Sequence, residues 1–121
     1  MMTEVTKQRN VTIIRLDQVY DSLDDRRIDD LGKLLLEQAE TAEPAKLLVD
    51  MQSTEFIGSS FIEVLFRAWK HTSDRGGRLV LGGVSPFCDS VFKAAQVDSI
   101  FDIYADTAAA QRSLEADSVP D

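Results

Sequence analysis

The stretch KLLVDMQSTEFIGSSFIEVLF, residues 46–66, contains the transition that decides the fold. Its first six residues form a short, mostly apolar segment that is bounded by Pro44 and a polar loop, and such a segment is typical of a buried strand. From Ser60 to about residue 73, apolar side chains recur at helical spacing. The stretch therefore predicts a strand, a loop and a helix in direct succession.

The rest of the chain repeats this alternation. Further strands are expected over 4–9, 11–16, 78–83 and 100–105, and further helices over 26–40, 86–96 and 106–116. Strands that alternate with helices imply right-handed crossovers and a parallel sheet, while the first two strands follow each other closely enough to form a hairpin. The predicted fold class is α/β, with a mixed, mostly parallel sheet of four to five strands and about four helices. We expect one domain over 1–121, with its core over about 4–115 and an acidic, frayed tail over 116–121.

Capping signals mark the ends of several predicted helices. Gly76 and Gly77 are expected to end the second helix, Ser85 before Pro86 to begin the third, and Asp106 or Thr107 to begin the last. Ser60 is followed three residues later by Glu63, which is the spacing of a capping box. We therefore expect Ser60 to cap the second helix and Ser59 to lie just outside it, near its positive end.

The charge of the chain limits its partners. Thirteen basic and twenty-one acidic residues leave a formal net charge of −8, which argues against attraction to nucleic acid or to anionic lipid. No apolar run approaches the ~18 residues that suggest a membrane span, and the N-terminal MMTEVTKQRN lacks the apolar core of a secretory signal. We expect a cytoplasmic protein that binds neither nucleic acid nor a membrane directly.

Residues that could carry catalysis are scarce. The sequence has one cysteine, Cys88, and one histidine, His71, and we interpret them as a packed thiol and a solvated side chain. No P-loop, GxGxxG, HExxH or nucleophile-elbow motif occurs. We expect no enzymatic activity, no cofactor and no metal.

The second predicted helix has more apolar surface than a sheet requires. At about 100° per residue its apolar side chains cover an arc of roughly 200°, whereas a stripe of ~100° suffices for packing on a sheet. The arc comprises Phe61, Ile62, Val64, Leu65, Phe66, Ala68 and Trp69. Two explanations remain open: a neighbouring helix covers the surplus, or a partner does, with Phe61 and Val64 at the edge nearest the serines.

Four segments, in their order and spacing, resemble a known family. They are SLDD (22–25), LLVDMQSTEFIGSSFIEVL (47–65), RGGRLVLGGVSP (75–86) and VDSIFDIYAD (97–106). Together they are similar to the STAS domains shared by sulfate transporters and anti-sigma factor antagonists, over roughly residues 4–115. The resemblance implies the STAS fold.

The resemblance also implies a function by partner switching. In that scheme the unphosphorylated antagonist binds an anti-sigma factor, which is also a serine kinase of the histidine-kinase ATPase class, and so releases a sigma factor. The kinase inactivates the antagonist by phosphorylating a serine, and a PP2C-type phosphatase restores it. Aligned on the family motif, Ser59 falls at the phosphoacceptor position and Ser60 on the second hydroxyl. The partner-binding surface is expected to comprise Ser53, Thr54, Glu55, Phe56, Ile57, Gly58, Ser59, Ser60, Phe61 and Val64.

The chain departs from the family motif at three positions. Gly58 stands where the family usually has aspartate, Phe61 where it has glycine, and Glu63 where a second glycine is common. These departures suit an alternative in which the chain is an unphosphorylated STAS adaptor subunit of a stress-signalling complex or an ABC transporter.

A third hypothesis, from a different class, is a receiver-like domain phosphorylated on Asp50. Such chemistry needs an acidic pair after the first strand and a lysine after the last. Asp17 stands alone after its strand, and IFDIYAD (100–106) has no lysine. The simpler interpretation of Asp50 is a polar strand end or a turn former.

Overall fold

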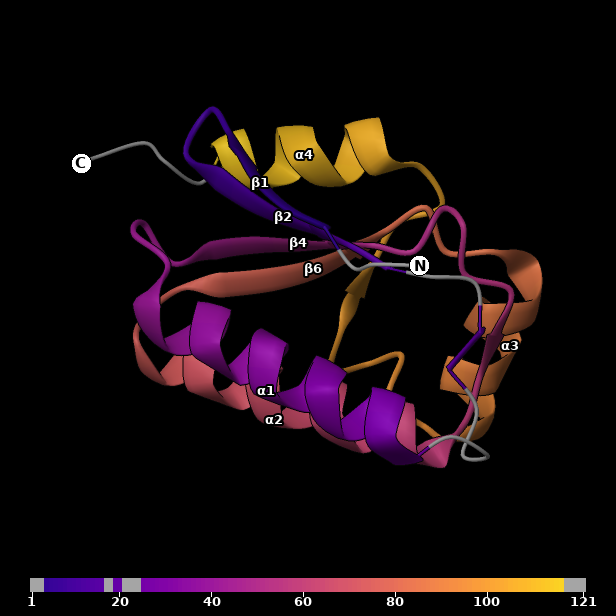
Figure 1. Ribbon diagram of the computed structural model, residues 1–121. Helices are drawn as coiled ribbons and strands as arrows, with labels where there is room; N and C mark the ends of the chain where they lie inside the picture. Colours follow the sequence, from indigo (N-terminus) through magenta and orange to yellow (C-terminus); the bar gives the residue numbers. More distant parts are fainter. Residues whose placement is uncertain (1–3, 17–18, 21–24, 117–121) are drawn as a thin grey trace.

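A five-stranded sheet forms the centre of the molecule in the computed structural model, which describes residues 4–16, 19–20 and 25–116 (Figure 1). The strand order is β1-β2-β4-β6-β7, with β1 antiparallel to β2 and all other neighbours parallel. The strands are β1 (Glu4–Gln8), β2 (Val11–Arg15), β4 (Lys46–Asp50), β6 (Arg78–Gly82) and β7 (Asp102–Ile103). The predicted α/β class and the mixed, mostly parallel sheet are confirmed.

Helices cover both faces of this sheet. α1 (Asp25–Thr41) and α2 (Ser59–Asp74) lie side by side on one face, and α4 (Thr107–Ala116) lies on the other (Figure 1). α3 (Pro86–Ala94) lies beyond the end of the sheet at which β4 and β6 finish (Figure 1). The carboxyl ends of the parallel strands therefore meet α3 and the beginning of α2, which is the edge where functional loops gather in α/β sheets.

The alternation of side chains along the strands divides the core into two parts. In β4, Leu47 and Val49 belong to the cluster under α1 and α2, whereas Leu48 faces the smaller cluster under α4. Neighbouring residues of a strand point to opposite faces, so an almost continuous apolar run fills both sides of the sheet. The second cluster comprises Val11, Ile13, Leu48, Val80, Ala110 and Leu114.

The predicted helix ends are confirmed at three places. At the end of α2, Gly77 N donates to Thr72 O and Gly76 N to Ser73 O, both over 2.9 Å, and Gly76 has φ +77. This is a Schellman motif, in which a glycine takes the left-handed conformation. In α3, the Ser85 hydroxyl accepts a hydrogen bond from Cys88 N over 3.1 Å. Asp106 begins α4 by accepting from Ala108 N over 2.7 Å and from Ala109 N over 3.3 Å.

The predicted elements needed correction in two places. The strand expected over 100–105 is reduced to Asp102–Ile103, because Ile100 and Phe101 both donate their amides to Val97 O and so belong to a turn. No local sequence pattern predicts β3 (Val19–Tyr20) and β5 (Phe56–Ile57), which pair in parallel as a separate two-stranded sheet. β5 matters for function because it leads directly into α2.

Candidate functional site

The N-cap of α2 lies two residues earlier than the side-chain signals predicted, so Ser59 is the first residue of the helix and does not lie outside it. Gly58 is the N-cap, with φ −126 and ψ −176, and it makes no side-chain cap bond. Its carbonyl accepts the first helical hydrogen bond, from Ile62 N over 3.2 Å. The prediction that Ser60 caps the helix in a box with Glu63 is therefore wrong. The extended backbone at Gly58 already directs a carbonyl into the helix, so Ser60 lies within the first turn.

The two serines differ in their environment. Ser59, the first residue of α2, is exposed, whereas Ser60 is half-buried. The amides of a first helical turn lack intrahelical partners and carry the positive end of the helix dipole. The described first turn of α2 contains no acidic residue. An anion attached to the Ser59 hydroxyl would therefore be stabilised by the positive end of the helix dipole, and no carboxylate of that turn would repel it.

The loop before α2 alternates between exposed and buried side chains. Ser53 and Glu55 are exposed and Phe56 is 50% exposed, while Thr54 and Ile57 are buried. Phe56 and Ile57 form β5, which pairs with β3 through their backbones. The alternation follows from the extended backbone, which points successive side chains to opposite sides.

The structure decides between the two explanations of the apolar arc of α2. Phe61 is fully buried and Val64 is 9% exposed. α1 lies alongside, and a Cβ built on Gly32 of α1 would lie only 3.0 Å from Val64 Cγ1. The neighbouring helix covers the part of the arc that contains Val64, as the simpler explanation held, whereas Phe66 of the same arc stays 38% exposed. Phe61 is out of a partner's reach and Val64 exposes little surface, so these two residues do not form the open edge of a partner surface that was expected.

The ten predicted partner-binding residues thus separate by burial. The exposed members are Ser53, Glu55, Phe56 and Ser59, the half-buried ones Gly58 and Ser60, and the buried ones Thr54, Ile57, Phe61 and Val64. The accessible part of the predicted surface consists of the loop and the first turn of α2, and the buried part is the core beneath it.

One exposed aromatic residue escaped the sequence analysis. Phe87, near the start of α3, is 51% exposed. Its ring contacts that of Phe56, with centroids 5.5 Å apart and planes at 68°. A signal was present in the sequence: the core face of α3 is formed by Cys88 and Phe92, four residues apart, and Phe87 does not fall on that face.

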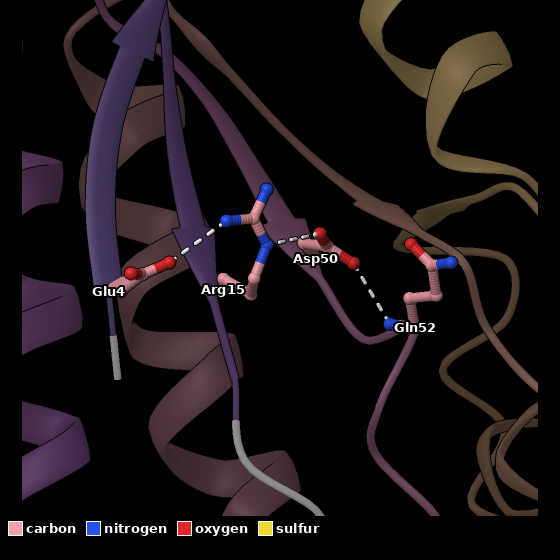
Figure 2. Close-up of polar contacts among 4 residues, drawn as sticks. All are labelled: Glu4, Arg15, Asp50 and Gln52. Atoms are coloured by element: carbon pink, nitrogen blue, oxygen red, sulfur yellow. Dashed lines mark hydrogen bonds and ion pairs between the residues drawn. The ribbon is translucent and has the colours of Figure 1, made fainter. Parts of the chain in front are cut away.

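Asp50 ends β4 within a small polar network (Figure 2). Its Oδ2 accepts a hydrogen bond from Arg15 Nε over 3.1 Å, and its Oδ1 accepts from Gln52 N over 2.9 Å. Arg15 Nη1 also donates to Glu4 Oε1 over 2.9 Å. The bonds to Asp50 and then Glu4 raise the pKa of Arg15.

This network bears on the phosphoaspartate hypothesis. Both carboxylate oxygens of Asp50 are engaged, its side chain is 5% exposed, and its bond to the amide two residues later forms an Asx turn. The interpretation of Asp50 as a strand-end turn former is confirmed. Asp17, the other residue of that hypothesis, lies outside the described residues.

The single cysteine is packed in the core, and the single histidine is exposed to solvent. Cys88 is fully buried, and its Sγ lies 3.8 Å from Thr54 O. Burial raises the pKa of the Cys88 thiol and outweighs the opposing hydrogen bond with Ser85. His71 is exposed on α2, with Nδ1 3.6 Å from Glu40 Oε2. Within the described ranges, no three His, Cys, Asp or Glu side chains converge to hold a metal ion.

Comparison with protein families and solved structures identifies the fold. A model described as "STAS domain" matches residues 2–110. The chain belongs to the STAS domain family. A comparison with curated proteins gives no significant match.

Three solved structures illustrate the similarity. An anti-sigma-factor antagonist (STAS) domain protein from Planctomyces limnophilus is 28% identical with TM-score 0.78, covering 91% of this chain and 96% of its own. A Thermotoga maritima protein described as an anti-sigma factor antagonist is 17% identical with TM-score 0.81, covering 93% of each chain. The phosphorylated Bacillus cell fate determinant SpoIIAA is 15% identical with TM-score 0.68, covering 93% of this chain and 99% of its own.

These comparisons place the chain among STAS domains that resemble anti-sigma factor antagonists. That antagonist family is typically non-enzymatic. In the part of the chain that the structure describes, no helix combines the length and apolar character needed to cross a bilayer.

Proposed function

We propose that this STAS domain is an anti-sigma factor antagonist that works by partner switching. Its unphosphorylated form binds an anti-sigma factor that is also a serine kinase of the histidine-kinase ATPase class, and a sigma factor is released. Phosphorylation of Ser59 by that kinase abolishes binding, and a PP2C-type phosphatase reverses it.

The observation that carries the proposal is the position of Ser59. It is exposed as the first residue of α2, beside the exposed residues of the preceding loop. A phosphate there would be stabilised by roughly 0.3 to 1 kcal/mol through the helix dipole, so the fold tolerates it. It would also add a charge of about −1.5 to −2 in the middle of the accessible surface. A partner that binds this surface would have to desolvate or match that charge.

The structural neighbours support the same proposal. SpoIIAA is described as an anti-sigma factor antagonist and has been solved in phosphorylated and unphosphorylated forms. At 14 to 15% identity these structures share the fold with this chain, and the role of Ser59 is inferred from its exposure and motif position.

The alternative, an adaptor subunit that is never phosphorylated, uses the same surface. The specific observation in its favour is Gly58, which places no carboxylate beside the candidate acceptor. The two proposals differ in one respect: only the switching antagonist carries a phosphate on Ser59 and loses its partner when it does.

Affinity capture from the native cell tests the proposal. The baits are the wild type, Ser59→Ala and Ser59→Asp, and Ser73→Asp serves as the control. Ser73 is exposed near the opposite end of α2, about 21 Å away at 1.5 Å per residue. We expect the wild type, Ser59→Ala and Ser73→Asp to retain a kinase-type anti-sigma factor, and Ser59→Asp to lose it.

Phosphopeptide mapping of the endogenous protein completes the test. Phosphate on Ser59, and no labelling of Ser59→Ala by the captured kinase, would support switching. Equal labelling of the wild type and Ser59→Ala would contradict Ser59 as the acceptor. Equal capture by all four baits, with no phosphate on Ser59, would support the adaptor instead.

A further inference from the structure

We propose that Phe56 and Phe87 form an aromatic anchor for the same kinase-type anti-sigma factor, so that the interface has two parts. Phosphorylation of Ser59 changes one part and leaves the aromatic anchor in place. This inference rests on the proposed function. It refines the switch in one respect: phosphorylation lowers the affinity below the level at which affinity capture retains the partner, and the weak affinity that is left depends on Phe87.

The two rings stand out from the rest of the described surface. Among the described residues, four large apolar side chains are exposed, namely Val5, Phe56, Phe66 and Phe87. Phe56 and Phe87 are about half exposed and contact each other at 5.5 Å between centroids. They come from segments thirty-one positions apart in the sequence, so the fold itself brings them together. Aromatic side chains, Phe among them, are enriched in the buried core of protein interfaces relative to the rest of the surface.

The structure holds the two backbone segments that carry the rings in place before any partner binds. The Ser85 hydroxyl fixes the first turn of α3 by accepting from Cys88 N, and Cys88 Sγ reaches Thr54 O in the loop that carries Phe56. β5 is further held by its pairing with β3. A preordered aromatic surface loses little conformational entropy on binding, which favours its use as an anchor.

The anchor is close enough to Ser59 to share one interface with it. Phe56 precedes Ser59 by three residues, so their Cα atoms are at most about 11 Å apart. An interface of ordinary size buries about 800 Å² on each partner, which corresponds to a patch about 30 Å across. One interface of ordinary size is therefore wide enough to include both Ser59 and the anchor.

The charges around the anchor indicate the chemistry of its partner. Glu55 is exposed beside Phe56, and on α3 Asp89 forms an ion pair with Lys93 at 3.1 Å. The chain as a whole has a net charge of −8. A surface that complements the anchor is an apolar slot bordered by Arg or Lys side chains, and in this proposal the slot belongs to the anti-sigma factor. A second copy of this chain would bring a like-charged Glu55 to the same place.

Binding measurements with the captured anti-sigma factor test the anchor. Phe87→Ser should weaken binding by about 30-fold, the factor that corresponds to the hot-spot threshold. Phe66→Ser is the matched control, because Phe66 is a phenylalanine of α2 that is 38% exposed and contacts Trp69 rather than the anchor. It should change the Kd by less than about 3-fold. Phe87→Leu, which keeps an apolar side chain, should fall between the two. Circular dichroism establishes that each variant is folded.

A double-mutant cycle separates this inference from the proposed function. Ser59→Asp should bind too weakly for affinity capture, but its Kd should still be measurable by direct titration at high protein concentration. Adding Phe87→Ser should raise that Kd by about the same factor as it does in the wild type. If Phe87→Ser binds like the wild type while Ser59→Asp is weakened, the anchor is refuted and switching stands. If only Phe87→Ser weakens binding, the switch fails and the anchor stands.

Two further outcomes would overturn the choice of partner. If the wild-type bait retains no anti-sigma factor, both the switch and the anchor are refuted. If sedimentation shows that the wild type dimerises and that Phe87→Ser is monomeric, the occupant of the anchor is a second copy of the chain.

Discussion

Arg15→Ala should destabilise the protein far more than the exposure of Arg15 indicates. The Arg15 side chain is 50% exposed, but its Nε bonds to Asp50, whose side chain is only 5% exposed (Figure 2). Removing the guanidinium leaves a buried carboxylate with Gln52 N as its remaining hydrogen-bond donor among the described contacts. The cost therefore arises at Asp50 rather than at the mutated residue.

The magnitude follows from this geometry. A hydrogen bond to a charged group contributes about 1.5 to 3 kcal/mol, and removing one partner of a fully buried ion pair costs about 3 to 5 kcal/mol. Because one end of this pair is half exposed and Gln52 N stays on the carboxylate, we expect Arg15→Ala to cost about 2 to 3 kcal/mol. In an Asp50→Asn background the charge is absent, and the same change should cost less than about 1 kcal/mol.

Equilibrium urea unfolding at neutral pH measures both values. Trp69, the single tryptophan, is partly buried and contacts Phe66 and Phe101, so its fluorescence reports the loss of packing. Glu4→Gln is the control, since it removes only the negative charge of the exposed partner of Arg15 and should cost about 0 to 1 kcal/mol. A loss below about 1 kcal/mol for Arg15→Ala, or an equal loss in both backgrounds, would refute the reasoning.

The remaining predictions concern the core, the helix caps and the thiol. Phe61→Ala should lower the free energy of unfolding by about 3 to 5 kcal/mol in urea denaturation, whereas Phe56→Ala should cost less than about 1 kcal/mol because its ring is half exposed. By the same measurement Ser85→Ala should cost about 1 kcal/mol through the lost cap, and Ser60→Ala less than about 0.5 kcal/mol, since Ser60 caps nothing. A cost at Ser60 as large as at Ser85 would contradict the assigned helix start. Burial raises the pKa of Cys88, so the thiol should react slowly with iodoacetamide until urea unfolds the chain. The stability linked to this raised pKa should be fully present below the ordinary cysteine pKa of about 8.5 and decline as pH rises above it; fast alkylation of the folded protein would disprove the assigned burial.

The elements that could be predicted from the sequence are those with a strong apolar period or a side-chain cap. β4 and β6 are apolar runs, and Ser85, Asp106 and the Gly76–Gly77 pair are local signals with a local mechanism. β3 and β5 have two residues each and exist because their backbones pair with one another. Such pairing is a property of the tertiary fold, and a strand of two residues is too short to show an alternation of apolar and polar side chains in the sequence.

The errors at the candidate site have a common cause. The sequence near α2 is not sufficient for Val64 and Ser60, because α1 packs against Val64 and the extended backbone at Gly58 starts the helix before Ser60. Phe87 lies in another segment altogether and joins the site only through its contact with Phe56. Local patterns therefore located the exposed serine, and the rest of its surface depends on contacts between distant segments.

Gly58 departs from the family motif in a way that suits the adaptor, but it also lowers the electrostatic cost of a phosphate on Ser59. An aspartate at the N-cap would accept a bond from a first-turn amide and place a negative charge beside Ser59. With Gly58 as the N-cap no side chain makes that bond, and the described first turn carries no acid. The positive end of α2 is therefore not already neutralised from within the turn when a phosphate is attached to Ser59. The departure from the family motif thus removes a like-charge repulsion between the N-cap side chain and a phosphate on Ser59. It also removes a side-chain cap, but the helix starts without one because the extended backbone of Gly58 directs its carbonyl into the first turn.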